Sequence, residues 1–159
     1  MIIKKAIINS LVLCAFFSTG LNAQTFQIQT TSISFENKLR PCLETEIDPA
    51  PKDLTKAWQK YLKKRFGIKL KSEKDDLLIA EDVMISTISD KRMNFNSRIT
   101  ETPTGSLMKV FVSYGYDIYI GDEGYTKEME TVRRIMNGFL LQTLNEYYSD
   151  AVKRETKNL

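Results

Sequence analysis

LMKVFVSYGYDIYIG, residues 107–121, is the longest β-strand candidate in the chain. Its β-branched, aromatic and aliphatic residues are typical of a strand in a partly buried sheet. Gly115 stands near the middle of the stretch, where it indicates a bulge or a bend. A long helix is predicted soon after this strand, and the two elements together favour a sheet covered by helices.

The predicted helix covers about residues 126–154, and its apolar residues recur at the spacing of an amphipathic helix. Acidic residues near its start and basic residues near its end suit the helix dipole. Gly138 lies inside the helix, at a cost of about 1 kcal/mol relative to alanine, and we expect it to allow a close approach to the sheet. The apolar stripe consists of Met129, Val132, Ile135, Met136, Phe139, Leu140, Leu144, Tyr147 and Ala151.

A shorter helix is predicted within KDLTKAWQKYLKKRFG, residues 52–67. Leu54, Trp58 and Leu62 fall on one face of it, so we expect Trp58 to belong to the core. The basic residues of its last turn suit the negative end of the helix dipole. Gly67 can take the left-handed conformation that ends a helix.

Short alternating runs predict the other strands. In one of them Leu43, Thr45 and Ile47 share a face. In another, Met93, Phe95, Ser97 and Ile99 face one way, whereas Asn94, Asn96 and Arg98 face the other. These strands cover about residues 26–35, 41–47, 66–71, 77–85 and 93–99.

The predicted order is therefore β-β-α-β-β-β-β-α. Short turns between consecutive strands favour a mostly antiparallel sheet of about six strands, and two striped helices need one face of it. The fold class that we predict is α+β, a two-layer sandwich with one short helix and one long C-terminal helix on one face. Residues 24–159 are expected to form a single domain.

Residues 1–23 are typical of a secretory signal peptide. Lys4 and Lys5 provide the positive start, an uncharged apolar region follows, and Ala23 is the expected cleavage position. Polar residues interrupt the run, which disfavours a transmembrane anchor. Leu13 is too large to precede a lipid-modified cysteine at Cys14. We therefore expect export to the periplasm or beyond, with Cys14 removed.

Cleavage after Ala23 changes the charge and the cysteine count. It removes two lysines and no acidic residue, so Lys+Arg falls from 23 to 21 against 20 Asp+Glu and the net charge falls from +3 to +1. A nearly neutral chain is unlike a nucleic-acid-binding protein. Cys42 is left alone, so no intramolecular disulfide can form. We expect its thiol to be inert, with pairing to another chain as the alternative.

The residue types exclude several catalytic mechanisms. The chain contains no histidine, which removes Ser-His and Cys-His nucleophiles and histidine zinc sites. It also lacks the glycine-rich loops that bind nucleotide phosphates. SLMK, residues 106–109, matches the S-x-x-K motif of penicillin-recognising enzymes, but it lies on a predicted strand and its partner motifs are absent. No cofactor is expected.

Carboxylates alone could still support catalysis, as they do in glycosidases. Asp117, Asp122 and Glu123 lie close together in the sequence, and the alternative is that they are solvated loop residues. Neither DIYIGDEG nor DKRMNFN has the alternating ligands of a calcium loop. We therefore expect no metal site.

Four tyrosines form the first candidate binding surface: Tyr114, Tyr116, Tyr119 and Tyr125. Exposed tyrosines favour contact with proteins or sugars because they offer a large amphipathic surface. We hypothesise that Tyr116 and Tyr119 project into a partner groove. The alternative is that the cluster caps the sheet edge and packs on the long helix.

A basic face is the second candidate. Lys56, Lys60, Lys63 and Lys64 lie together on the first helix, and Lys69 and Lys71 follow it. Such a face could contact anionic lipid head groups, with a contribution of about 1 kcal/mol per residue. Alternatively, the lysines are simply solvated.

AWQKYLKKR (residues 57–65), the following sheet and a long helix containing NEYYSD (residues 145–150) resemble a loose group of uncharacterised small exported proteins of Gram-negative bacteria. The resemblance implies an α+β fold and export. It brings no activity and no functional residues.

The functional prediction is an exported, non-catalytic binding or interaction module of the cell envelope. Its partner would be an unknown protein or small ligand, held between the sheet and the long helix, and contact with a membrane surface is left open. The alternative is a small carboxylate-dependent hydrolase of the periplasm.

Overall fold

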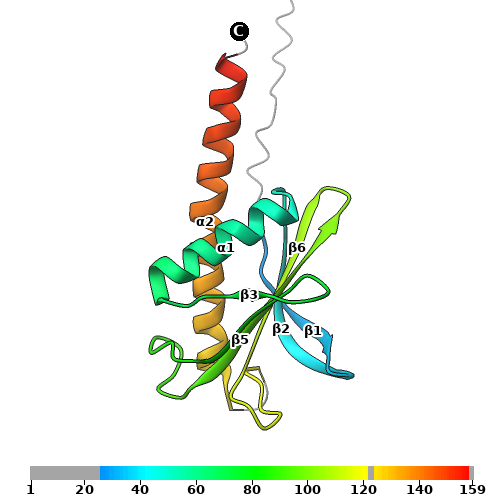
Figure 1. Ribbon diagram of the computed structural model, residues 1–159, viewed down its shortest axis with the longest axis vertical. Helices are drawn as coiled ribbons and strands as arrows, with labels where there is room; N and C mark the ends of the chain where they lie inside the picture. The colour runs from blue at the N-terminus through cyan, green and yellow to red at the C-terminus, as the bar shows by residue number, and fades with distance from the viewer. Residues whose placement is uncertain (1–25, 122–123, 158–159) are drawn as a thin grey trace, which may run out of the picture.

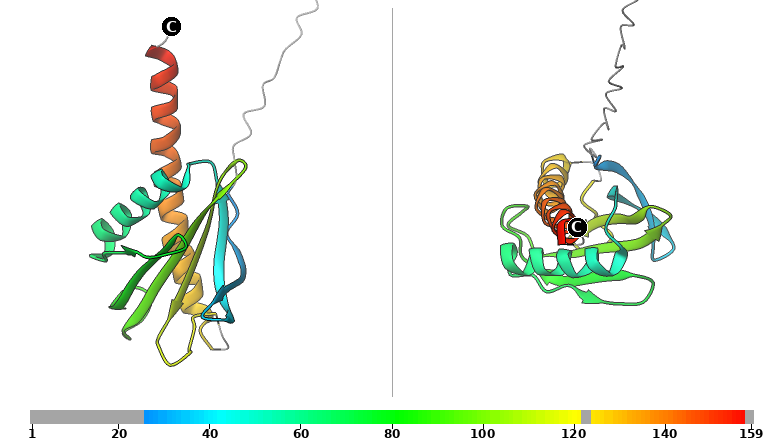
Figure 2. Two further views of the ribbon diagram at one scale, coloured as in Figure 1. Left: turned by 45° about the vertical axis from the view of Figure 1, so that its right-hand side comes forward. Right: turned by 90° about the horizontal axis from the view of Figure 1, so that it is seen from above.

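The computed structural model describes residues 26–121 and 124–157, and it confirms the predicted α+β fold. A six-stranded antiparallel sheet carries two helices on the same side (Figures 1 and 2). The predicted signal peptide with Cys14, and the acidic residues Asp122 and Glu123, lie outside the described residues.

The strands are arranged in the order β1-β2-β6-β5-β4-β3, and every neighbouring pair is antiparallel. The last strand in the sequence is therefore inserted between the first hairpin and the rest of the sheet. The elements are β1 (Gln29–Phe35), β2 (Lys38–Ile47), α1 (Pro51–Phe66), β3 (Lys71–Ser72), β4 (Leu77–Val83), β5 (Met93–Thr102), β6 (Gly105–Ser113) and α2 (Thr126–Lys157).

Helix α1 begins at Pro51, where the missing N–H of proline costs nothing. It ends at Gly67, whose φ of 71° is left-handed. The Gly67 N–H donates to the carbonyl of Lys63 at 3.1 Å, which satisfies one of the free carbonyls of the last turn. The face made by Leu54, Trp58 and Leu62 is buried, as predicted.

Helix α2 has 32 residues and buries side chains from Met129 to Leu144. Its C-terminal end extends beyond the sheet (Figure 1), where the Tyr148 hydroxyl donates to Asp48 Oδ2 at 2.5 Å. Among the described residues, no helix has both the length and the hydrophobicity that a membrane crossing needs.

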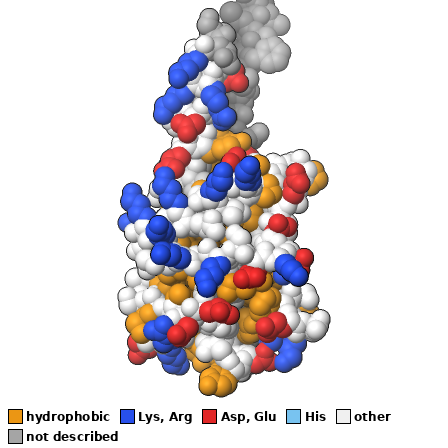
Figure 3. Space-filling model, viewed as in Figure 1, with side chains coloured by type: hydrophobic (Ala, Val, Ile, Leu, Met, Phe, Trp, Pro, Cys, Tyr) orange, Lys and Arg blue, Asp and Glu red, His pale blue; other side chains and the backbone are white. Residues whose placement is uncertain are grey.

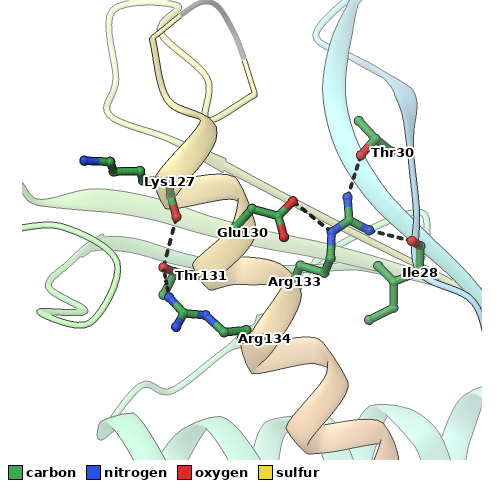
Figure 4. A network of polar contacts seen from close by, with 7 residues as sticks. All are labelled: Ile28, Thr30, Lys127, Glu130, Thr131, Arg133 and Arg134. Atoms are coloured by element: carbon green, nitrogen blue, oxygen red, sulfur yellow. Dashed lines mark hydrogen bonds and ion pairs between the residues drawn. The ribbon is translucent and has the colours of Figure 1, made fainter.

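Arg133 connects α2 to the first strand (Figure 4). Its guanidinium donates to the carbonyl of Ile28 and to Thr30 Oγ1, the latter at 2.7 Å, while Glu130 Oε1 lies 3.2 Å from its Nε. These contacts hold the long helix against the edge strand β1, which is far from it in the sequence.

Trp58 is at the centre of the core between the helices and the sheet. Its ring centroid lies 4.7 Å from that of Phe139 on α2 and 6.1 Å from that of Phe95 on β5. Its Nε1 donates to Ser97 Oγ at 3.0 Å. Around Trp58, packed side chains therefore fill the space between the sheet and α2, the region where the sequence suggested a ligand.

The predicted strand over residues 107–121 is two segments. Strand β6 ends at Ser113, and the chain then reverses, with the Tyr114 N–H donating to the Ile118 carbonyl at 2.9 Å. Tyr119 forms an antiparallel bridge back to Ser113. Of the bulge or bend predicted at Gly115, the structure has the bend, as a turn that reverses the chain.

The faces of β4 and the role of Gly138, which was expected to allow a close approach to the sheet, became clear only in the structure. In β4, Leu78 and Ala80 face the core, whereas Leu77 and Ile79 face the opposite side, and a bulge follows Ala80. Gly138 gives room to the Tyr61 hydroxyl of α1, not to the sheet, since a Cβ at Gly138 would stand 2.9 Å from it.

Candidate functional site

A pocket of about 280 Å³ lies on the face of the sheet that carries no helix. We call it the open-face pocket. Its floor comes from strands β4, β5 and β6, through Ile79, Asn94, Asn96 and Ser113. Its walls are the β1–β2 turn, with Phe35 and Glu36, and the turn after β6, with Tyr116 and Asp117.

The turn after β6 has an unusual backbone. Gly115, Tyr116 and Asp117 have φ values of 81°, 50° and 67°, so three consecutive residues are left-handed. For residues other than glycine this conformation costs about 1 kcal/mol or more, and it persists only where surrounding contacts impose it. The contacts here come from strand β2, because Asp117 forms ion pairs with Arg40 and, at 2.6 Å, with Lys38.

Arg40 links this turn to the sheet. It is only 7% exposed, and its guanidinium lies 4.5 Å from the centroid of the Tyr119 ring. Hydrogen bonds from Arg40 and Lys38 hold the pKa of Asp117 below its usual value. Asp117 therefore stays ionised at neutral pH and cannot donate a proton as a general acid.

Asn96 is the most informative residue of the floor. It is 3% exposed, and its side-chain amide has no hydrogen-bond partner among the described residues, although it lines the pocket. Its neighbour Asn94 differs, because Asn94 Oδ1 accepts a hydrogen bond from the Asp82 N–H at 3.0 Å. The Asn96 amide is not among the fully buried side-chain atoms that lack a partner, so it opens into the pocket that it lines and is available to a ligand.

The four candidate tyrosines are divided between two places. Tyr116, 99% exposed, stands at the rim of the open-face pocket, and Tyr119, 5% exposed, lies in its wall beneath Arg40. Tyr114 and Tyr125 pack on the main core instead, with ring centroids 5.2 Å apart. Because Tyr119 is buried, replacing Tyr116 and Tyr119 together would damage the fold as well as the pocket.

The lysines of the candidate basic face are exposed, and Lys and Arg side chains gather over α1 (Figure 3). Lys56, Lys60 and Lys64 line a groove between α1 and α2. Lys63 is exposed but does not line it. Lys69 and Lys71 are also exposed and outside the groove.

Of the three candidate carboxylates only Asp117 lies in the described part of the chain, and the carboxylates of that part include none with a clearly raised pKa. The acidic side chains with clearly shifted pKa values are Asp82 and Asp117, and a hydrogen bond from arginine lowers both values. A catalytic acid needs a raised pKa. Within residues 26–121 and 124–157, no three acidic or cysteine side chains gather as metal ligands.

Sequence reasoning did not identify Arg40, Asn96, Glu36 and Glu81 as site residues. The available signal was the run of Asn94, Asn96 and Arg98 on the polar side of β5. That run indicates which side of the sheet the amides face. It does not indicate that the β1–β2 turn and the turn after β6 lie beside them.

Cys42 is 1% exposed and burial raises the pKa of its thiol to about 11. We therefore expect the folded Cys14→Ser variant to react with a thiol reagent at least about a hundredfold more slowly at pH 8 than the same variant in urea, because the thiolate is the reactive form. Absorbance on release of the reagent's chromophore measures both rates. Equal rates would show that Cys42 is accessible.

No protein-family model, no curated protein and no solved structure matches the chain.

Proposed function

We propose that this protein is an exported, non-catalytic binding module that takes a small hydroxylated ligand, such as one sugar unit of an envelope glycan, in the open-face pocket. The amide of Asn96, which opens into the pocket from a residue that is otherwise buried, is the observation that carries the proposal. Export is supported by the signal-peptide pattern of residues 1–23.

The chemistry of the pocket favours this class of ligand. The floor offers the Asn96 amide and the Ser113 hydroxyl, which can both donate and accept hydrogen bonds. Phe35 and Tyr116 supply aromatic surface at the wall and rim. Glu36 and Glu81 make the pocket unfavourable for anions. A volume of about 280 Å³ suits a single sugar unit better than a long chain.

The direct test is ligand-observed NMR with a panel of neutral monosaccharides and disaccharides. We expect at least one sugar to bind the wild-type chain, and we expect Asn96→Leu and Tyr116→Ala each to abolish that binding. Tyr148→Ala is the matched control, because Tyr148 is an exposed tyrosine on α2 outside the pocket. Binding that survives Asn96→Leu would place the sugar elsewhere and refute the assignment.

A stability measurement tests the role of Asn96 without any ligand. We expect Asn96→Leu to leave the free energy of unfolding unchanged to within about 0.5 kcal/mol, because the amide opens into the pocket and the substitution breaks no hydrogen bond between described residues. Urea denaturation followed by circular dichroism measures this.

Asn94→Leu is the control on the same strand and face. It removes the hydrogen bond to the Asp82 N–H, so it should lower the free energy of unfolding by about 1 kcal/mol. If Asn96→Leu destabilised the protein more than Asn94→Leu did, Asn96 would serve the fold and not a ligand.

A further inference from the structure

The groove between the two helices has a volume of about 410 Å³ and a strongly asymmetric charge. Lys56, Lys60, Lys64 and Arg65 line it from α1. The α2 side contributes Gln142, Thr143 and a single acid, Glu146. The groove lies on the helical side of the sheet, so it is distinct from the open-face pocket.

None of the four basic side chains forms an ion pair with another residue of the described ranges. Glu146, the one carboxylate in the groove, accepts a hydrogen bond from Gln142 Nε2 at 3.0 Å. Four positive charges therefore face one hollow against a single negative charge, and none of the four is held in an ion pair. Such an arrangement concentrates anions, and the walls of a groove strengthen the effect.

The floor of the groove is rigid and aromatic. The Tyr61 ring stacks on Trp58, with ring centroids 5.9 Å apart and an interplanar angle of 11°. The centroid of the Tyr61 ring also lies 5.4 Å from that of Phe139. Gly138 leaves space for its hydroxyl group. A ligand would therefore contact a fixed aromatic floor. The lysine side chains around the floor could change conformation to reach the ligand.

We propose that this groove binds an elongated ligand that carries two or more phosphate groups. Lys56, Lys60 and Lys64 follow one another at four-residue intervals on α1, which places them about 6 Å apart along the helix axis and about 12 Å from first to last. Directly linked phosphates stand closer together than this, but the long and flexible lysine side chains can converge on them, and phosphates joined by a short linker can contact successive lysines. Lysine ammonium groups suit phosphate because they act as point charges without a fixed geometry, and Gln142 and Thr143 add hydrogen-bond donors.

The matched pair Lys60→Glu and Lys63→Glu tests this proposal. Both variants make the same charge change on the same helix at exposed positions, but only Lys60 lines the groove. With inorganic tripolyphosphate as the ligand, isothermal titration calorimetry should show affinity reduced by about tenfold or more in Lys60→Glu. The reduction in Lys63→Glu should be no more than about threefold.

Two arms of the experiment distinguish the source of the phosphate. Flotation with phosphatidylcholine vesicles, with and without cardiolipin, tests a lipid head group that carries two phosphates. Cardiolipin-dependent flotation that Lys60→Glu abolishes and Lys63→Glu preserves would assign the groove to a membrane lipid. Binding of tripolyphosphate alone, with the same dependence on Lys60, would assign it to a soluble ligand.

The proposal would be overturned in two ways. One is an equal loss of affinity in Lys60→Glu and Lys63→Glu, which would indicate diffuse surface charge. The other is a wild-type chain that binds neither tripolyphosphate nor cardiolipin vesicles. Far-ultraviolet circular dichroism of both variants checks that the helices are intact, as the exposure of both lysines leads us to expect.

Discussion

Trp58→Ala should lower the free energy of unfolding by about 3–5 kcal/mol, which is much of the stability of a domain of this size. The indole is fully buried and touches both helices and the sheet through Tyr61, Phe95 and Phe139. Removing it leaves a cavity where α1, α2 and β5 meet. Urea denaturation followed by circular dichroism measures the loss.

Trp58→Phe separates packing from hydrogen bonding. It keeps most of the apolar volume but leaves the Ser97 hydroxyl, which is fully buried, without its indole donor. We expect a loss of about 1–3 kcal/mol. If Trp58→Ala cost no more than Trp58→Phe, the indole would not be the centre of the core between the helices and the sheet.

Gly105→Ala should destabilise the protein by about 2–4 kcal/mol, the second large effect. Gly105 begins β6, where the chain passes the end of β2. A Cβ at this position would stand 2.7 Å from the carbonyl oxygen of Asp48 and closer still to that of Ile47. Both obstacles are backbone atoms, so they cannot rotate away. Thermal unfolding by calorimetry measures the change.

Gly67→Ala is the appropriate comparison. Gly67 has a left-handed φ of 71°, but a Cβ there meets nothing within 4 Å. Its substitution should therefore cost only the conformational strain, about 1 kcal/mol. A Gly105→Ala variant as stable as Gly67→Ala would mean that β2 and β6 can separate without loss, contrary to the close approach described above.

The fold could be predicted from the sequence wherever a local pattern decides the structure. Both helices, the inward face of Leu43, Thr45 and Ile47, and the polar face of Asn94 and Asn96 follow from periodicity, because burial repeats at the spacing of the element. The strand over residues 107–121 could not be predicted correctly in the same way. The residues of its second half favour a strand, yet Asp117 is fixed by Arg40, 77 residues away in the chain.

The candidate site depended on the same kind of distant contact. The sequence indicated Tyr116 and Tyr119 and the direction of the Asn96 amide. It could not show that the β1–β2 turn and the turn after β6 form opposite walls, because that follows from the strand order. Nor could it show that Lys63 differs from Lys60, since the difference depends on where α2 crosses the first helix.

The insertion of β6 between β2 and β5 also bears on how the chain folds. The β1–β2 hairpin and the β4–β5–β6 meander are both built from neighbouring segments, so both can form by local closure. The seam that joins them pairs Leu43 with Val110, with a helix and three strands between these residues in the chain. Closing such a long loop costs more chain entropy than closing the short turns within the hairpin and the meander. The rate of folding should therefore be governed by the joining of two preformed pieces, and the N-terminal hairpin must wait for β6 before it has a sheet to enter.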